Sequence, residues 1–397
     1  MSQPAEPAHA ATRPPPVVAL SEIARQWGRI GVTGFGGPPA HIALLRRLCV
    51  EDRGWIGAGE FGDAIAACNL LPGPASTQLA IWCGWRLRGR TGALVAGACF
   101  IAPGLAMILA LSALFLAPHP PLLVLGAAAG AGAAVPAVAV HAAWGLAPAS
   151  WQRIEAGTVR AARARWIGYA LLGAAAAALT GPFLVLVLIA CGLVETAVRT
   201  RPSGASGAFV PLALPVAVSA GGLTALVWEA FKVGALSYGG GFVIIPLMQH
   251  DAVHTYHWMT NAQFLDAVAL GQVTPGPVVL TTAVVGFAAA GYAGALLAVA
   301  VAFSPSFAFI LLGARHFDRL RGNHRVQAFL TGAGPSVIGA IAGSAIPLAL
   351  ALGQRWQYVL LPAAALWLLA ARRGVVSVLL LAGACGVIAA VTGLPVT

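Results

Sequence analysis

The chain has 397 residues, of which 59% are hydrophobic and only 9% are charged, and its mean hydropathy is +0.84. Soluble domains carry about 25% charged residues, so this composition excludes a water-soluble monomer. The net charge of +11 does not indicate nucleic-acid binding, because the arginines stand in small groups between apolar runs. Apolar stretches long enough to cross a bilayer of roughly 30 Å recur from about residue 91 onward. We therefore predict an all-α polytopic membrane protein.

The first 20 residues are rich in alanine and proline and lack the apolar core of a signal peptide. We expect them to form an uncleaved, disordered tail on the cytoplasmic side. Six cysteines lie mostly inside apolar runs without a Cys-x-x-Cys spacing. This pattern predicts packing residues rather than disulfides or metal ligands.

The chain contains two similar halves. Sliding the sequence against itself by 203 residues aligns Gly36-Gly37 with Gly239-Gly240, and Pro72-Gly73-Pro74 with Pro275-Gly276-Pro277. So many glycine and proline coincidences at one offset indicate an internal duplication. Further pairs at this offset are Arg29 with Lys232, Trp55 with Trp258, Phe61 with Phe264, Asp63 with Asp266 and Asn69 with Gln272.

Each half contains six apolar segments. Those of the first half lie at about 28–45, 61–85, 91–117, 121–147, 166–181 and 182–198. Those of the second lie at about 232–248, 262–288, 292–313, 328–352, 356–371 and 374–393. A thirteenth segment at 209–228 has no partner, as expected if the second half is inverted across the membrane. The predicted units are the tail at 1–20, an N-terminal repeat at 21–201, a linker with the unpaired helix at 202–230, and a C-terminal repeat at 231–397.

The arginines test how many of these segments span. If every segment crossed, the arginines at 46–53 would lie opposite those at 86–90, against the positive-inside rule. Glycines and prolines break the first segment at 36–39 and the second at 72–74, so we predict that both re-enter as hairpins. Thirteen full spans are the alternative, which leaves three arginines outside.

With hairpins and an inverted second half, only Lys232 and Arg355 among the lysines and arginines lie outside. The N-terminus is then cytoplasmic and the C-terminus periplasmic or extracellular.

The broken segments are the candidate substrate site. Helix N-termini opened by such breaks point backbone N–H groups and a positive dipole end into a cavity, which suits an anion. The alternative is that the prolines are simple kinks and the glycines close-packing points. The candidate substrate-binding residues are Arg29, Phe35, Gly36, Gly37, Pro38, His41, Asn69, Pro72, Gly73, Pro74, Ser76, Lys232, Tyr238, Gly239, Gly240, Gly241, Gln272, Pro275, Gly276 and Pro277.

Two pairs of matched charges accompany the breaks. Arg29 and Lys232 would supply fixed positive charge to the cavity, or they would anchor the helices by snorkelling. Asp63 and Asp266 are candidates for proton coupling, because a carboxylate inside an apolar segment is costly. Their position near the start of each segment is also compatible with helix capping.

No cofactor is predicted. His250, Asp251, His254 and His257 have the spacing of a metal site, but a solvated histidine-rich loop explains them more simply. The chain has no nucleophile, base and orienting group at a recognisable spacing, so we do not expect an enzyme.

In combination and order, these motifs resemble the chromate ion transporter family in its long, two-domain form. The resemblance runs from about residue 20 to the end. It implies an exporter of chromate from the cytoplasm, driven by the proton-motive force, that confers chromate resistance from the inner or plasma membrane. The motifs are Thr33-Gly34-Phe35-Gly36-Gly37-Pro38 with Ala40-His41, Leu71-Pro72-Gly73-Pro74-Ala75-Ser76, Tyr238-Gly239-Gly240-Gly241 and Thr274-Pro275-Gly276-Pro277.

The energetics agree with efflux of a dianion. Moving two negative charges outward down an inside-negative potential releases about 2 × 2.3 kcal/mol per 100 mV, and the chain has no phosphate-binding loop for ATP. Sulfate has nearly the same shape and charge, so we expect it to compete or to be exchanged. Uptake of sulfate or another oxyanion and a passive anion channel are the alternatives. The sequence leaves open whether two chains pair as a homodimer.

Overall fold

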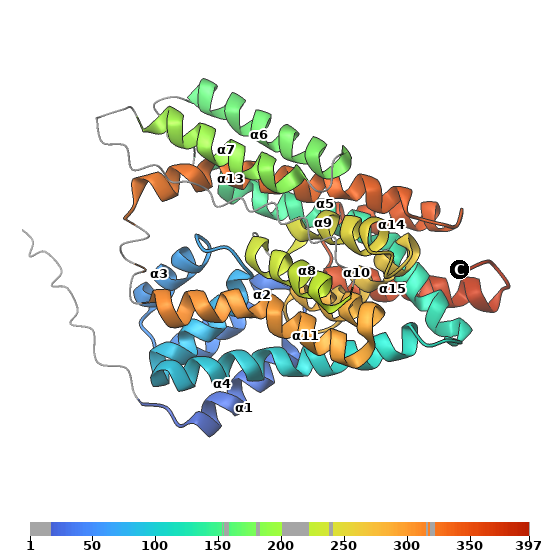
Figure 1. Cartoon of the computed structure of the whole chain (residues 1–397), viewed down its shortest axis with the longest axis horizontal. Helices are drawn as coiled ribbons and strands as arrows, with labels where there is room; N and C mark the ends of the chain where they lie inside the picture. Colours follow the sequence, from blue (N-terminus) through green and yellow to red (C-terminus); the bar gives the residue numbers. More distant parts are fainter. Residues whose placement is uncertain are drawn as a thin grey trace, which may run out of the picture.

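A computed structural model describes residues 17–152, 154, 159–179, 183–200, 222–237, 241–314, 317 and 322–396 (Figure 1). These residues form helices and turns, with no β-strand among them. The first half contains α1 (Leu20–Thr33), α2 (Pro38–Arg46), the π-helical turn η1 (Arg47–Asp52), α3 (Ala58–Cys68), α4 (Ala75–Phe115), α5 (Leu122–Trp151), α6 (Val159–Leu179) and α7 (Leu184–Arg199). The second half contains α8 (Leu223–Leu236), η4 (Phe242–Ile244), α9 (Ile245–Gln249), η5 (His250–Thr255), α10 (Asn261–Val273), η6 (Val278–Leu280), α11 (Thr281–Gly313), α13 (His324–Leu350), α14 (Gln357–Leu369) and α15 (Val375–Val391).

Four helical stretches in the described part of the chain are long and apolar enough to cross a membrane: α4, α5, η6 with α11, and α13. Apolar residues are spread around all sides of these helices, which is typical of helices that lie in lipid or in a protein interior. Helices α14 and α15 are apolar but shorter. The predicted all-α membrane architecture is thereby confirmed.

Helix α4 is a tight hairpin rather than one straight rod. Its backbone leaves the helical region at Arg88 and Gly89, where Gly89 has a φ of +63°. A β-carbon on Gly84 would lie 2.4 Å from the carbonyl oxygen of Gly92, although eight residues of straight helix would separate them by about 12 Å. The two arms therefore fold back on each other, at the boundary predicted between segments 61–85 and 91–117.

The second half repeats this hairpin. Helix α11 leaves the helical region at Ala290 and Gly291, where Gly291 has a φ of +60°. A β-carbon on Gly286 would lie 2.6 Å from the carbonyl oxygen of Gly294. Because these positions lie 202 residues after those of α4, the duplication predicted from the sequence is present in the fold.

The predicted breaks fall between short helices. Residues 34–37 separate α1 from α2, and residues 69–74 separate α3 from α4. Helices α1, α2 and α3 have 14, 9 and 11 residues, which at 1.5 Å per residue is about 14–21 Å. None reaches across a hydrocarbon core of roughly 30 Å. This geometry favours hairpins over thirteen full spans.

The arginine groups lie at one end of the molecule. Arg25 and Arg53 both pair with Glu22, at 2.6 and 3.1 Å, and Arg88 donates to the carbonyl oxygen of Val18 at 3.4 Å. The hydrogen bond from Gln26 and the two arginine charges lower the pKa of Glu22. The start of α1, the end of η1 and the turn of α4 therefore meet, as the hairpin interpretation requires.

The halves are intertwined. Helices α5 and α13 pack against each other, α5 also packs against α14 and α15, and α13 packs against α6 and α7 (Figure 1). Each of the two central helices carries a pair of prolines twelve residues apart, Pro136 and Pro148 in α5 and Pro335 and Pro347 in α13. Each repeat thus covers the central helix of the other, which leaves neither with a complete core of its own.

The second repeat starts earlier than the predicted residue 231. Helix α8 begins at Leu223, the position equivalent to Leu20 at the start of α1. Residues 223–230 of the predicted linker therefore belong to a helix that has a partner in the first half. Most of the predicted unpaired helix at 209–228 falls on residues 201–221, which lie outside the described residues.

Candidate functional site

The first break is held by a buried histidine. His41 Nε2 lies 2.8 Å from the carbonyl oxygen of Gly34, and His41 Nδ1 lies 3.3 Å from Ser76 Oγ. Because a carbonyl only accepts, Nε2 carries the proton and the Ser76 hydroxyl donates to Nδ1. The imidazole is fully buried, with Phe100 packed edge-on at 5.0 Å. His41 thus joins the break between α1 and α2 to the start of α4.

The same Gly34 carbonyl joins the two repeats. It also accepts a hydrogen bond from the backbone N–H of Gly276, at 3.1 Å. Gly276 is the central residue of the second Pro-Gly-Pro sequence, and its φ of +106° is one that side chains rarely adopt. The first break of one repeat therefore touches the second break of the other.

Each Pro-Gly-Pro sequence packs against the long hairpin of the opposite repeat. A β-carbon on Gly73 would lie 3.1 Å from Ser306 Oγ in α11, and one on Gly104 in α4 would lie 2.2 Å from the carbonyl oxygen of Pro275. Gly104 and Ser306 are equivalent positions, 202 residues apart. The first break and both Pro-Gly-Pro sequences therefore contact the opposite repeat.

Several buried polar atoms around these breaks have no hydrogen-bond partner. Buried polar groups are nearly always satisfied by protein or water, so a group of unsatisfied ones marks a place for water or a ligand. Both acceptors and donors occur among them, which gives the junction the groups to hold a hydrated anion. The atoms are Thr77 Oγ1, Gln78 Oε1, Ser237 Oγ, Gln272 Nε2 and Ser306 Oγ.

Not every helix start offers backbone donors. Helix α2 begins with Pro38 and Pro39, which have no N–H, so its first turn has few free donors. Helix α4 begins at Ala75 with no side-chain cap, and its first N–H groups have no partner within the helix. The start of α4 is therefore the better anion site of the two.

A cavity of about 180 Å³ opens beside this helix start. Asn69 and Gly73 line it from the second break of the first repeat, while Ser150 of α5 and Thr331 of α13 face them. Trp166 donates to Ser150 at 3.0 Å, which leaves the serine hydroxyl hydrogen available. The cavity therefore presents amide and hydroxyl groups next to the uncapped start of α4.

The equivalent place in the second half is packed differently. Alignment of the paired prolines puts Gly132 of α5 at the position of Thr331 in α13. A β-carbon on Gly132 would lie only 2.7 Å from Asp266 Oδ1 in α10, whereas Asp63 in α3 is exposed. The two halves are thus alike in sequence and differ in packing, because Asp266 packs against α5 whereas its counterpart Asp63 is exposed.

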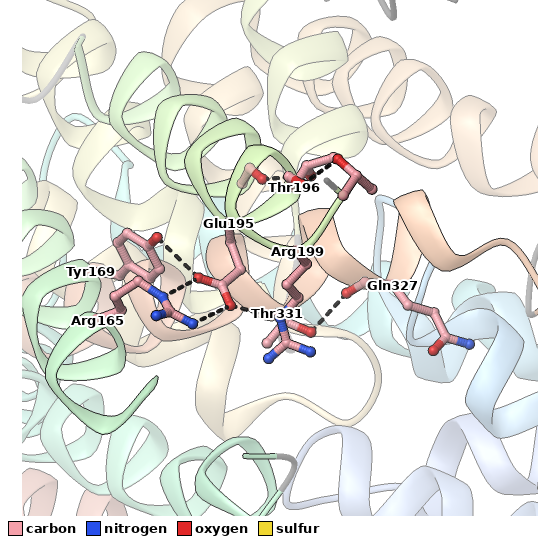
Figure 2. Close-up of polar contacts among 9 residues, drawn as sticks. Arg165, Tyr169, Glu195, Thr196, Arg199, Gln327 and Thr331 are labelled. Carbon is pink, nitrogen blue, oxygen red and sulfur yellow. Dashed lines mark hydrogen bonds and ion pairs between the residues drawn. The ribbon is translucent and has the colours of Figure 1, made fainter. Parts of the chain in front are cut away.

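Figure 2 shows a cluster of charged side chains around the buried Glu195 of α7. Glu195 of α7 accepts from Arg165 at 2.8 and 3.2 Å and from Arg199 at 2.7 Å, and Tyr169 donates to it at 3.1 Å. Glu195 packs on Gly332 of α13, one residue beyond the Thr331 that lines the cavity. Two arginines with one carboxylate leave a positive charge there. Sequence inspection missed Glu195, because its partner Arg165 lies 30 residues away.

The matched cations have different surroundings. Arg29 is exposed, whereas the Lys232 ammonium pairs with Glu229 at 2.7 Å and with Asp251. Sequence inspection missed Glu229, although its spacing of three residues from Lys232 on one helix was a usable signal. Lys232 therefore meets carboxylates rather than the open cavity.

The other predicted residues divide between the described and undescribed parts of the chain. Tyr238, Gly239 and Gly240 lie outside the described residues, while Gly241 has a φ of +93°. Phe35 is exposed. Across the described ranges, no group of three or more His, Cys, Asp or Glu is arranged to hold a metal. The rings of His250 and His254 lie 5.8 Å apart, tilted at 47° to each other.

Comparison with known proteins agrees with this architecture. The chromate transporter family model matches residues 21–196 and again 224–389. A chromate transport protein of Cupriavidus metallidurans is 32% identical, covering 84% of this chain and 84% of its own length. One of Pseudomonas aeruginosa is 32% identical, covering 86% and 84%, and a probable one of Synechococcus elongatus is 28% identical, covering 84% and 85%. No solved structure matches. The chain belongs to the chromate transporter family.

Proposed function

We propose that this protein exports chromate from the cytoplasm, binding it where the first break and the two Pro-Gly-Pro sequences contact the opposite repeat. The observation that carries the proposal is the group of unsatisfied buried polar atoms at that junction, next to an open cavity. The relatives from Cupriavidus metallidurans and Pseudomonas aeruginosa are named chromate transport proteins. The proposal transfers that substrate to this chain.

The binding chemistry suits a tetrahedral dianion. The uncapped start of α4 supplies backbone N–H donors, and the Asn69 amide and Ser150 hydroxyl add side-chain donors. The Arg165–Glu195–Arg199 cluster contributes a net positive charge behind the α13 wall. Because these groups read charge and shape only, sulfate is expected to compete.

The cavity faces the side on which we place the cytoplasm. Thr331 lies near the start of α13, and Ser150 lies near the end of α5. Both helix ends adjoin the arginine-bearing loops, which the positive-inside rule assigns to the cytoplasm. We infer a state open to the cytoplasm and closed on the outside, where Asp266 packs against Gly132.

Export then requires the two repeats to exchange these two packing arrangements, so that the outer side opens and the cytoplasmic side closes. In the outward-open state, Asp63 would approach Thr331 while Asp266 leaves Gly132, because the two sites are related by the repeat. We propose that protonation of these two aspartates couples this exchange to the proton-motive force. The membrane is the inner or plasma membrane, with the N-terminus inside.

A cellular experiment tests the function. Expression in a chromate-sensitive bacterium should lower chromate accumulation and raise resistance, and Asp63→Asn or replacement of Pro72 and Pro74 by alanine should restore accumulation. Membrane levels of each variant, measured by immunoblot, provide the control. Unchanged accumulation and sensitivity on expression of the wild type would refute chromate export.

A further inference from the structure

The second repeat contains a buried cluster of charges without a counterpart in the first. Glu229 of α8 is 0% exposed. Lys232, one turn further along α8, pairs with Glu229 Oε2 at 2.7 Å and also with Asp251 Oδ2 in η5. Because Lys232 Nζ contacts one oxygen of each carboxylate, the Glu229 and Asp251 side chains lie close together. Two carboxylates thus share one ammonium group inside the protein.

Charge counting shows that this cluster has room for a proton. With both carboxylates ionised, the cluster carries one uncompensated negative charge in a buried place, which is costly. Two carboxylates form a hydrogen bond with each other only when one of them carries a proton. Glu229 Oε1 also has no donor among the described residues. A proton on Glu229, donated to Asp251, removes the excess charge and supplies the missing hydrogen bond.

We propose that Glu229, with Asp251 and Lys232, is a proton-binding site of the transporter, loaded and emptied once in each cycle. This inference rests on the proposed transport function. It adds a third, unpaired site to the matched aspartates.

The first repeat does not duplicate this site. The positions equivalent to Glu229, Lys232 and Asp251 are Gln26, Arg29 and Leu48, at the offset of 203 residues. A site present in one repeat only is emptied toward one side more readily than toward the other. Such a site can give direction to a protein whose halves are otherwise alike.

The surroundings of the cluster include few other titratable groups. Tyr256 and His250, both close to Asp251 in the chain, interact with it electrostatically. Helix α11, which packs against α8, carries Tyr292 as its titratable side chain, and this residue is exposed and packs on Phe287.

A cavity next to His250 provides a route for the proton. His250 lines a cavity of about 340 Å³ with His254, Gln249 and Asn261. The Lys232 side chain is 16% exposed, so the cluster is not sealed. Protons can reach Asp251 from this cavity through His250, and we place that cavity on the outer side, where Leu350 at the end of α13 also lines it.

The decisive test measures protons and chromate together. Purified protein in liposomes would be assayed for radiolabelled chromate flux and, with a trapped pH dye, for proton flux. Wild type should move a fixed number of protons per chromate, and Glu229→Gln should move one fewer while still exchanging chromate for chromate. Glu60→Gln, which removes another ion-paired carboxylate, is the matched control and should keep the wild-type ratio. An unchanged ratio in Glu229→Gln would overturn the proposal.

A second measurement separates this inference from the transport function. Infrared difference spectra across a pH titration should contain a protonated-carboxyl band that shifts in D₂O and disappears in Glu229→Gln. Asp251→Asn should also alter the band, and it serves if Glu229→Gln does not fold. Absence of the band in wild type would contradict the proton site whether or not chromate is transported. Wild-type protein that carries the band and moves no chromate would contradict only the proposed function.

Discussion

Replacement of Gly73 by alanine should damage the first Pro-Gly-Pro break more than the same change at Gly276 damages the second. Gly73 has a φ of +115°, and its added β-carbon would lie 2.6 Å from Gln78 Nε2 and 3.1 Å from Ser306 Oγ. Gln78 cannot move freely, because its Nε2 donates to the carbonyl oxygen of Pro72 at 2.7 Å. The methyl group therefore strains the backbone and displaces a hydrogen-bonded side chain.

The cost follows from these two effects. A non-glycine residue in a sparsely populated backbone region costs about 1–3 kcal/mol. Loss of the Gln78 hydrogen bond adds about 0.5–1.5 kcal/mol. A total of about 1.5–4.5 kcal/mol lowers the equilibrium constant between the native and the disrupted break roughly 10- to 1,600-fold, at 1.4 kcal/mol per factor of ten. We expect transport to fall by at least tenfold.

Two other glycines provide graded controls. Gly276 has a φ of +106°, but the nearest atom to its β-carbon would be Leu280 Cδ1 at 3.2 Å, and this flexible side chain can move away. Gly54 has a φ of +59° with nothing within 4 Å, away from the breaks. Thermal melting in detergent and chromate accumulation in cells should rank the alanine variants as Gly54 mildest, then Gly276, then Gly73. A Gly73→Ala protein as active and stable as Gly54→Ala would refute the reasoning.

Three further substitutions test separate parts of the structure. His41→Ala removes the two hydrogen bonds of its imidazole and leaves the Gly34 carbonyl with one donor. Thermal melting in detergent should therefore show a loss of stability of about 2–4 kcal/mol. An unchanged melting curve would be inconsistent with a structural role for these hydrogen bonds. Glu195→Gln should destabilise the protein by about 1–3 kcal/mol. This is less than the roughly 3–5 kcal/mol lost when a fully buried ion pair is broken, because Arg165 and Arg199 are partly exposed. Equal chemical denaturation of the wild type and the variant would argue against this role. Gly132→Val should push the side chain at position 266 away from α5. In a protein with Asp266→Cys, adding Gly132→Val should therefore speed the reaction of that cysteine with a water-soluble maleimide. Equal reaction rates with and without Gly132→Val would contradict a closed gate at this place.

The sequence predicts the breaks well because glycine and proline act locally. Proline lacks an N–H and glycine accepts a positive φ, so Pro72-Gly73-Pro74 interrupts a helix whatever surrounds it. The turn at Arg88 and Gly89 is marked in the same way, by a glycine between two apolar runs. Duplication then transfers each local prediction to the second half, which is why both halves could be outlined.

Hydropathy alone places the start of the second repeat poorly. Residues 209–228 read as one apolar segment, yet α8 begins at Leu223 inside it. No polar residue marks that boundary, because a helix in lipid and the apolar chain before it have the same composition. Comparison of Leu223 with Leu20 at the repeat offset would have located it.

The closest contacts of the candidate site lay beyond sequence reasoning. The Gly34 carbonyl meets the Gly276 N–H across 242 residues, and Glu195 meets Arg165 through the packing of α6 against α7. Neither pairing has a local signature. The difference between the open break and the closed one is likewise a property of packing, since Asp63 and Asp266 occupy equivalent positions in sequence.

Transport of radiolabelled chromate into inverted membrane vesicles tests the central claim most directly. Vesicles containing the wild-type protein should accumulate chromate when their membrane is energised, collapse of the pH gradient should lower that accumulation, and excess sulfate should compete. Vesicles containing Asn69→Ala should show weaker chromate uptake, because that amide lines the cavity beside the start of α4. Wild-type vesicles that take up no more chromate than vesicles without the protein would contradict the account.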